Sequence, residues 1–386
     1  MKPMPYGHQW IDRKDIEGVV RVLRSDWLTQ GPKVKEFEDA LCRYTGSRYA
    51  VAVSSGTGGL HIACLAAGIG GGDEVITSPM TFAASANCAI YCGARPVFAD
   101  VREDTVNIDP NEIEKNLSKK TAAVIPVHFA GHPCDMEALA GIAGKNRLIV
   151  IEDAAHALGA EYKDSKIGSC RYSDMTVFSF HPVKTITTGE GGAVLTNNER
   201  LYKKLLLLRT HGIERIDFKD KSAGPWYYEV QCLGFNYRMS DIQAALGISQ
   251  LKKVDSFIEN RRDIAEAYDR AFKDNGCFDL PKESPGCRSS YHLYFLRLRS
   301  GYKAKRWEIF SRLRRRGLGV QVHYIPVYTH PYYKRLGYKR RLCRRAEDLY
   351  ERLISIPIYP AMTKGDIGHV VKTVLDVFKN IAGRRS

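Results

Sequence analysis

The sequence lacks any apolar run that approaches the ~18 residues needed to span a membrane. It also lacks a charged and then apolar leader in its first residues, MKPMPYGHQW, and it contains neither an internal repeat nor a low-complexity tract. These absences argue against membrane insertion and against secretion. We therefore expect a globular, cytoplasmic protein.

Cysteine is present but is not clustered. The ten cysteines are scattered, and the closest pair, Cys88 and Cys92, has no second pair and no group of histidines behind it. We therefore expect reduced, buried thiols, which agrees with a cytosolic protein. His128, His132 and Cys134 in HFAGHPCD could suggest a metal site. Because they follow a strand-like run into a proline turn, we expect core and turn residues there, and no metal.

The formal net charge is +15, and basic residues gather late in the chain, in RRRG at 314–317, KRRLCRR at 339–345 and GRRS at 383–386. Such clusters can bind nucleic acid, but here they are not interleaved with aromatic residues and accompany no recognisable recognition helix. The sequence favours a solvated basic surface, with nucleic-acid binding as the alternative. An anionic small substrate would also suit the charge.

A chain of 386 residues with 44% hydrophobic content favours two domains, or one large domain with a lobe. Short apolar or β-branched runs alternate with helix-like segments as far as about residue 200, and this alternation predicts an α/β domain with a mostly parallel sheet. These runs cover 49–53, 74–77, 96–99, 122–127, 148–152, 176–180 and 193–196. A long helical pattern follows Ser240 through DIQAALGISQLKKVDSFIENRRDIAEAYDRAF. We place a large domain with its N-terminal segment at 1–255 and a smaller α+β C-terminal domain at 256–386.

Two residues of opposite charge follow strand-like runs. Asp153, in EDAAHALGA, comes directly after LIVI, and Lys184, in SFHPVKTITTGEGG, comes after TVFSF. Because α/β sheets bind ligands at the carboxyl ends of their strands, both side chains are expected at one edge. Such a pair is typical of pyridoxal phosphate sites, where lysine attaches the cofactor and aspartate keeps its pyridine nitrogen protonated. A surface lysine and a helix-capping aspartate are the ordinary alternatives.

Two further segments suit the same cofactor. SSGTGG, at 54–59, lies between the run YAVAV and a helix expected from about Leu60, so its N–H and hydroxyl groups could bind a phosphate. Tight-turn geometry alone would also explain the glycines. Phe82, in SPMTFAASAN, is expected to begin the next helix and to stack on the pyridine ring, and its alternative is an ordinary core phenylalanine.

These segments, together with LGFNYRMSDIQAALG, resemble the sugar-nucleotide aminotransferases of the DegT/DnrJ/EryC1/StrS family in sequence and spacing. The resemblance extends from DWLTQGPKVKEFE to QVHYIPVY at 321–328. It implies the aspartate aminotransferase fold (fold type I), pyridoxal 5'-phosphate as cofactor, and transfer of an amino group from L-glutamate to a nucleotide-linked 4-keto-6-deoxy sugar. Lys184 favours transamination, because relatives that act as dehydratases have histidine there. A non-catalytic regulatory relative is the alternative.

The resemblance implies two catalytic residues. Lys184 would hold the cofactor and move a proton, and Asp153 would pair with the pyridine nitrogen. His156 would lie near the ring hydroxyl, and Phe82 would stack on the ring.

The resemblance also implies that two subunits share each site. Gly56, Thr57 and Ser179 would bind the cofactor phosphate from one subunit, and Asn236 would reach the same phosphate from the other, so that the site would exist only in a homodimer. The positions that match substrate-binding residues are Tyr6, Asp26, Trp27, Leu28, Thr29, Gly56, Ser179, Asn236, Gln321, Val322, His323 and Tyr324.

The SFHPVK and QVHY elements look most like members of the family that act in pseudaminic acid biosynthesis, which implies a UDP-linked N-acetyl sugar as substrate. Another UDP- or dTDP-linked keto sugar is the alternative. Many relatives have alanine where this chain has Gly58 and Gly59, and glycine is the weaker helix former, so we expect a looser phosphate-binding turn.

Overall fold

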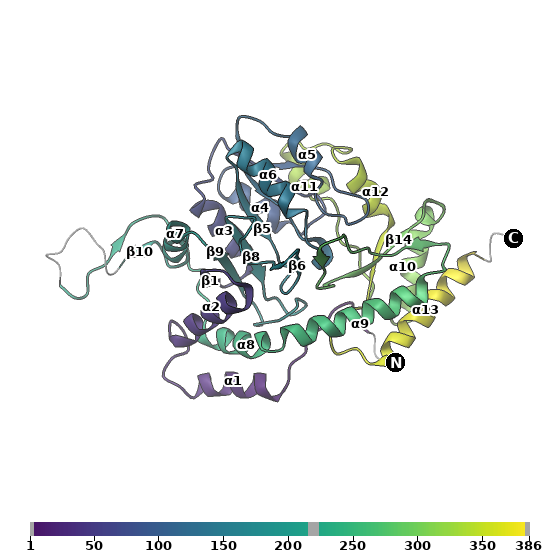
Figure 1. Cartoon of the computed structure of the whole chain (residues 1–386), viewed down its shortest axis with the longest axis horizontal. Helices are drawn as coiled ribbons and strands as arrows, with labels where there is room; N and C mark the ends of the chain where they lie inside the picture. The colour runs from purple at the N-terminus through teal and green to yellow at the C-terminus, as the bar shows by residue number, and fades with distance from the viewer. Residues whose placement is uncertain (1–3, 215–223, 383–386) are drawn as a thin grey trace.

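The computed structural model describes residues 4–214 and 224–382. Its centre is a seven-stranded sheet in which β9 runs antiparallel to both of its neighbours and every other pairing is parallel (Figure 1). In spatial order the strands are β1 (Tyr49–Val53), β9 (Gly192–Thr196), β8 (Met175–Ser179), β5 (Ile149–Asp153), β4 (Thr121–Ile125), β2 (Glu74–Thr77) and β3 (Arg95–Phe98). The predicted α/β fold with a mostly parallel sheet is confirmed.

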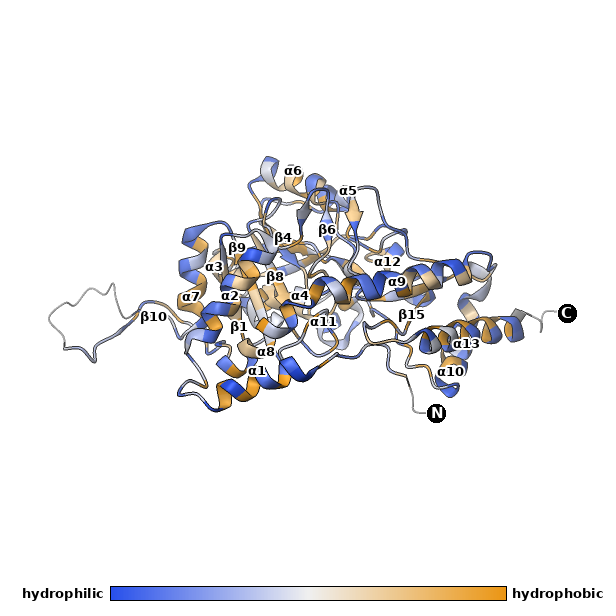
Figure 2. Cartoon of the chain, turned by 60° about the horizontal axis from the view of Figure 1, so that its bottom comes forward, coloured by the Kyte–Doolittle hydropathy of each residue, from blue (hydrophilic) through white to orange (hydrophobic). Residues whose placement is uncertain are grey.

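Helices cover both faces of this sheet, which explains why its strands are nearly continuous apolar runs. One face packs against α3 (Gly56–Ala66), α4 (Ala84–Tyr91) and α7 (Glu199–Arg209). The other face packs against α2 (Pro32–Thr45), α5 (Pro110–Lys115), α6 (Met136–Asn146) and α8 (Asp241–Leu251). Figure 2 shows the apolar strands at the centre, and α9 (Val254–Phe272) and α13 (Lys364–Ala382) with both hydrophilic and hydrophobic bands.

Helix α3 begins inside the glycine-rich segment, four positions before the expected start near Leu60. The reason is a cap: the Ser55 side chain accepts a hydrogen bond from the Gly58 N–H at 3.1 Å. Gly58 and Gly59 also have a packing role that the sequence did not indicate. A Cβ atom at Gly59 would lie 2.9 Å from Val177 Cγ1, so the glycine lets α3 pack closely against β8.

The long helical pattern after Ser240 forms two helices rather than one. A capping box between Ser240 and Gln243 begins α8, and α9 (Val254–Phe272) starts after a break at Lys252 and Lys253. At this break the Lys253 ammonium lies 2.6 Å from a carboxylate oxygen of Asp15, at the first turn of α1 (Arg13–Leu23). An ion pair at this break therefore connects the long helices to the N-terminal helix.

The C-terminal part has its own antiparallel sheet of β12 (Phe278–Asp279), β14 (Tyr294–Leu298) and β15 (Leu353–Ile356). Among the described residues, this part also contains the helices α10 (Arg306–Arg315), α11 (Pro331–Arg335), α12 (Arg344–Arg352) and α13 (Lys364–Ala382). The remaining short elements are β6 (Glu161–Tyr162), β7 (Ser165–Lys166), β10 (Ile213–Glu214), β11 (Glu229–Val230), β13 (Cys287–Arg288), η1 (Phe129–Gly131), η2 (Ser300–Lys305) and η3 (Val327–Thr329).

Helix α9 joins the two parts, because its first turns and its later turns bury side chains in different cores. Phe257 and Ile258 pack in the core of the large sheet, and Tyr268 and Phe272 pack with the C-terminal sheet. The boundary at 255/256 therefore remains a proposal within a continuous helix. Among the described residues, no helix combines the length and the apolar character needed to cross a membrane.

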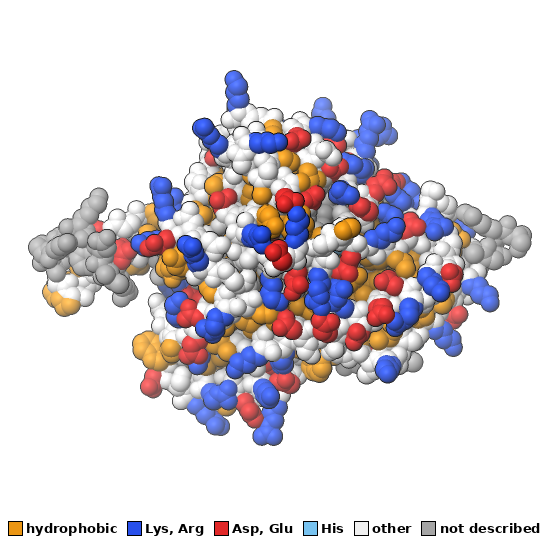
Figure 3. All heavy atoms as spheres, in the orientation of Figure 1, with side chains coloured by type: hydrophobic (Ala, Val, Ile, Leu, Met, Phe, Trp, Pro, Cys, Tyr) orange, Lys and Arg blue, Asp and Glu red, His pale blue; other side chains and the backbone are white. Residues whose placement is uncertain are grey.

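Some of the arginine side chains in the C-terminal part form ion pairs with carboxylates. Arg345 lies 2.9 Å from Asp109 and 3.2 Å from Glu112, and Arg316 lies 3.4 Å from Asp376. Figure 3 shows lysine and arginine interspersed with aspartate and glutamate over the visible face. The GRRS cluster lies outside the described residues.

Candidate active site

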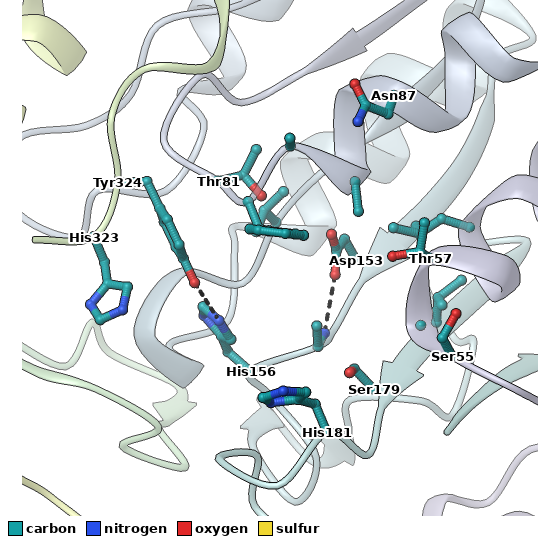
Figure 4. Close-up of a pocket in the computed structure, with 18 of the residues that line it drawn as sticks. Ser55, Thr57, Thr81, Asn87, Asp153, His156, Ser179, His181, His323 and Tyr324 are labelled. Atoms are coloured by element: carbon teal, nitrogen blue, oxygen red, sulfur yellow. Dashed lines mark hydrogen bonds between the residues drawn. The ribbon is translucent and has the colours of Figure 1, made fainter. Parts of the chain in front are cut away.

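A cavity of about 1090 Å³ opens at the carboxyl ends of the parallel strands, between the large sheet and the C-terminal part. This is the edge at which an open α/β sheet places its ligands. Most of the site residues expected from the sequence line it, and they are Tyr6, Gly56, Thr57, Phe82, Asp153, His156, Ser179, Lys184, Gln321, Val322, His323 and Tyr324. Figure 4 shows Tyr324 and His156 on one side, Ser55 and Thr57 on the other, and Asp153 between them.

Asp153 is the last residue of β5 and is almost fully buried. Each of its carboxylate oxygens accepts one hydrogen bond. The Ala155 N–H donates to Oδ1 at 3.1 Å, and the Ser85 hydroxyl donates to Oδ2 at 2.6 Å. The carboxylate is therefore held in one orientation at the wall of the cavity.

Lys184 reaches the cavity from the loop after β8, where its backbone N–H donates to the His181 carbonyl at 2.9 Å. Burial lowers the pKa of its amine from 10.5 to about 8, and the negative charge of Asp153 opposes this shift without cancelling it. A substantial fraction of the amine is thus neutral near physiological pH, as a nucleophile requires.

The first turn of α3 presents backbone N–H groups to the cavity. Ser55 caps the Gly58 N–H, but within residues 4–214 and 224–382 the N–H groups of Gly56 and Thr57 have no acceptor. Free N–H groups at the start of a helix favour a phosphate. Ser179, at the end of β8, lies against this turn, since a Cβ atom at Gly56 would approach the Ser179 Cβ to 2.9 Å.

His156 lies in a stack of aromatic side chains. Its ring centroid is 4.2 Å from that of His292, and its Nε2 lies 3.1 Å from the Tyr324 hydroxyl. Burial, followed by the positive charge of Lys184, holds the pKa of His156 well below its usual value, so the imidazole is neutral. Its buried Nδ1 has no hydrogen-bond partner in the part of the chain that the structure describes.

These groups fit pyridoxal phosphate. The cofactor needs a phosphate site, an amine for attachment and a carboxylate for its pyridine nitrogen, and all three face one cavity. Phe82 is 65% exposed and lines the same cavity, in the turn before α4 rather than at the start of that helix as expected. The unpartnered Nδ1 of His156 offers a further polar contact.

The predicted residues outside this cavity gather elsewhere. The segment 26–29, which comprises Asp26, Trp27, Leu28 and Thr29, is exposed and pairs with the start of α8, where Thr29 bridges Ser240. Asn236 is also exposed and precedes the same helix by a few residues. One surface therefore carries both groups, and it does not contribute to the cavity of its own chain.

The candidate metal ligands are engaged within the fold. His128 Nε2 lies 2.8 Å from a carboxylate oxygen of Glu152, and its Nδ1 accepts the Cys134 N–H at 3.0 Å. His132 Nε2 accepts the Ser284 N–H at 2.9 Å. The Cys134 thiol donates to the Val127 carbonyl at 3.2 Å, so each of the three side chains has a hydrogen-bond partner within the fold.

Several residues at the cavity were not predicted. Among them are Asn87, His181, His292, His330, Tyr332 and Tyr333. Two of these, Asn87 and His181, lie within motifs already recognised, SPMTFAASAN and SFHPVK, so helical and turn spacing could have indicated them. His292 comes from the C-terminal part, and no local signal connects it to the large sheet.

Comparison with known proteins identifies a family of aminotransferases. The model of the DegT/DnrJ/EryC1/StrS aminotransferase family matches residues 9–375. Spore coat polysaccharide biosynthesis protein SpsC of Bacillus subtilis (strain 168) is 42% identical over 97% of each chain. UDP-4-amino-4,6-dideoxy-N-acetyl-beta-L-altrosamine transaminase of Campylobacter jejuni (strain 81-176) is 41% identical over 97% of this chain and 98% of its own. The structure of Helicobacter pylori PseC, an aminotransferase of pseudaminic acid biosynthesis, superimposes with a TM-score of 0.91 at 35% identity, covering 98% of this chain and 100% of that one.

Proposed function

Because the chain belongs to the DegT/DnrJ/EryC1/StrS aminotransferase family, we propose that it transfers the amino group of L-glutamate to C4 of a UDP-linked 4-keto-6-deoxy sugar. The family membership confirms the predicted class, a pyridoxal phosphate-dependent sugar aminotransferase of fold type I. The proposed substrate is UDP-2-acetamido-2,6-dideoxy-β-L-arabino-hexos-4-ulose. The products are UDP-4-amino-4,6-dideoxy-N-acetyl-β-L-altrosamine and 2-oxoglutarate.

The main support for the proposal is that Lys184, Asp153 and the first turn of α3 all line one cavity. A lysine at this position can both attach the cofactor and carry a proton. A histidine there, as in the dehydratases of the family, could not attach it. A binding protein without catalysis would have no need for a lysine amine whose pKa is lowered to about 8.

Pyridoxal phosphate, when bound, supplies an electron sink for cleavage of the C–H bond of the amino donor. The Lys184 amine would hold the cofactor and, when it is free, would move a proton between the donor's α carbon and the C4′ carbon of the cofactor. Asp153 holds the proton on the pyridine nitrogen, and the N–H groups of Gly56 and Thr57 bind the phosphate. Neutral His156 contributes a hydrogen bond near the ring without adding a competing positive charge.

We further propose a homodimer in which Asn236 and the segment 26–29 of each subunit complete the cavity of the other. Both lie on one exposed surface of the chain and away from its own cavity. Neighbouring apolar side chains support an interface, since Trp27 is 56% exposed and Leu23 is 55% exposed. Figure 2 shows hydrophobic residues as orange bands on the ribbon of α1, at the edge of the molecule.

The specific sugar is supported by two relatives, since the Campylobacter protein is an altrosamine transaminase and PseC acts in pseudaminic acid biosynthesis. Aromatic and apolar groups from Tyr6, Phe82 and Tyr324 line the cavity and suit the less polar face of an N-acetyl, 6-deoxy sugar. The similarity to SpsC is as high, so amination of another UDP- or dTDP-linked keto sugar is the second candidate. We propose a cytoplasmic location, in keeping with ten cysteines that are all free thiols.

The test is an amination assay with defined keto sugars. Holoenzyme with L-glutamate is incubated with the β-L-arabino ketosugar, its D-xylo epimer and a dTDP-linked 4-keto-6-deoxy sugar. Formation of 2-oxoglutarate and of the aminated product is followed by mass spectrometry and NMR. Turnover of the β-L-arabino sugar is expected, whereas turnover confined to the epimer or to the dTDP sugar would refute the specific substrate.

A further inference from the structure

A buried pair of hydroxyl groups lies behind the proposed partner of the pyridine nitrogen. Ser85 Oγ is 2.6 Å from Asp153 Oδ2, and Thr81 Oγ1 is 2.7 Å from Ser85 Oγ. Ser85 is fully buried, and Thr81 and Asp153 are nearly so. We propose that Ser85, supported by Thr81, is a positioning residue that holds the Asp153 carboxylate toward the pyridine nitrogen of the bound cofactor. The proposal rests on the proposed pairing of Asp153 with that nitrogen, but not on the identity of the sugar.

The direction of the hydrogen bonds follows from the acceptors within reach. A serine hydroxyl donates one hydrogen. Around Ser85 Oγ lie the Asp153 carboxylate at 2.6 Å, Thr81 Oγ1 at 2.7 Å and the Phe82 carbonyl at 3.4 Å. The carboxylate is the nearest and the strongest of these acceptors, so Ser85 donates to Asp153 and accepts from Thr81. The two hydroxyls thus form a chain that ends on the carboxylate, and each bond polarises the next.

The second carboxylate oxygen is fixed independently. The Ala155 N–H donates to Oδ1 at 3.1 Å, so each oxygen has one protein donor and keeps a lone pair for the cofactor. The terminal torsion of an aspartate is otherwise soft. With a donor on each oxygen, rotation of the carboxylate would break both hydrogen bonds, and its plane is therefore set before the cofactor binds.

The chain position of Ser85 links two contacts to the ring. Thr81 directly precedes Phe82, the candidate for stacking on the ring, in the turn that leads into α4, and Ser85 lies in the first turn of that helix. One short turn of the chain therefore presents the stacking side chain and, through Ser85, orients the carboxylate that meets the ring nitrogen. A shift of this turn would disturb both contacts together.

The experiment follows the ring nitrogen directly. Holoenzyme is prepared with pyridoxal phosphate labelled with ¹⁵N in the pyridine ring, and the nitrogen resonance is recorded by NMR across a pH series. In Ser85→Ala we expect a smaller protonated fraction at a given pH, retained cofactor, and a kcat lower by roughly 10- to 100-fold, as for loss of a hydrogen bond to a charged group. Thr81→Val should move the resonance the same way by less, and Ser85→Cys, a weaker donor of similar size, should lie between Ser85→Ala and wild type.

Thr77→Val is the matched control. The Thr77 hydroxyl is also fully buried but donates to the Ile125 carbonyl at 2.8 Å, so its loss should lower the stability and leave the ring resonance at its wild-type position. A wild-type resonance in Ser85→Ala, with a changed one in Asp153→Asn, would overturn the role of Ser85 and leave the proposed function standing. Unchanged resonances in both would overturn the Asp153 pairing as well. If Ser85→Ala does not fold, wild-type resonances in Ser85→Cys and Thr81→Val overturn the proposal.

Discussion

Tyr324 and His156, which are 168 positions apart in the chain, share a hydrogen bond of 3.1 Å at the wall of the cavity, and their rings stack with an interplanar angle of 17°. Tyr324 belongs to the C-terminal part, and His156 follows the central strand β5. Burial raises the pKa of the Tyr324 phenol, so it remains a neutral donor. The hydrogen bond joins a residue proposed to face the sugar to one proposed to face the cofactor ring (Figure 4).

Tyr324→Phe removes this hydrogen bond and keeps the ring stack. We expect a kcat/KM for the sugar lower by roughly 10-fold, as for loss of one buried hydrogen bond, and little change in cofactor retention. Steady-state kinetics with the cofactor absorbance as a second readout check this. A loss of cofactor with unaltered kinetics per bound cofactor would contradict the assignment of Tyr324 to the sugar side.

Asp153→Asn keeps the shape of the side chain and removes its charge. The pyridine nitrogen then loses the anion that keeps it protonated, so we expect a kcat lower by at least ~100-fold with the cofactor still bound. Single-turnover measurements with L-glutamate alone separate this effect from sugar binding. Unchanged turnover would remove Asp153 from the site.

The lowered pKa of Lys184 predicts a pH dependence for reconstitution. The neutral amine is the attacking form, and because its pKa is about 8 rather than 10.5, its fraction rises through pH 8 and levels off above about pH 9. The rate at which apoenzyme attaches pyridoxal phosphate should follow that curve in stopped-flow absorbance. A rate that keeps rising by about tenfold per pH unit beyond pH 9 would indicate an unshifted lysine.

A shared site predicts complementation between two inactive variants. Lys184→Ala removes the lysine of a subunit's own cavity, and Asn236→Ala removes the asparagine that the subunit supplies to its partner's cavity. A mixed dimer therefore contains one cavity with an intact lysine and an intact partner asparagine. Mixing the two after subunit exchange should restore part of the activity, up to about a quarter of wild type for random exchange with one working site in each mixed dimer. Exchange demonstrated by mass spectrometry without any recovery would argue that each chain completes its own site.

Local signals allowed much of the site to be predicted. Lys184, Asp153 and the turn at 54–59 each follow a strand whose apolar run is readable by itself, and parallel strands bring those ends to one edge. The start of α3 was misplaced because the Ser55 cap lies inside the glycine-rich segment. Helices α8 and α9 were merged because the break at Lys253 depends on Asp15, far away in the sequence.

The rest depends on contacts that no short segment encodes. Ser85 contributes through the register of α4 against β5, and His292 meets His156 only because the C-terminal sheet packs on the large one. The packing role of Gly59 has the same origin, since its need for a small side chain comes from Val177 on strand β8. Sequence spacing gives the chemistry of a site, while long-range packing sets the orientation of its groups.

Lys184 as the point of cofactor attachment is the claim on which the other roles depend. Holoenzyme is treated with borohydride, digested, and analysed by mass spectrometry for a peptide that carries the reduced pyridoxyl group. We expect that group on the peptide containing Lys184, and neither the label nor turnover in a folded Lys184→Ala variant. A label on another lysine, or near wild-type turnover by Lys184→Ala, would contradict the assignment of this cavity as the active site.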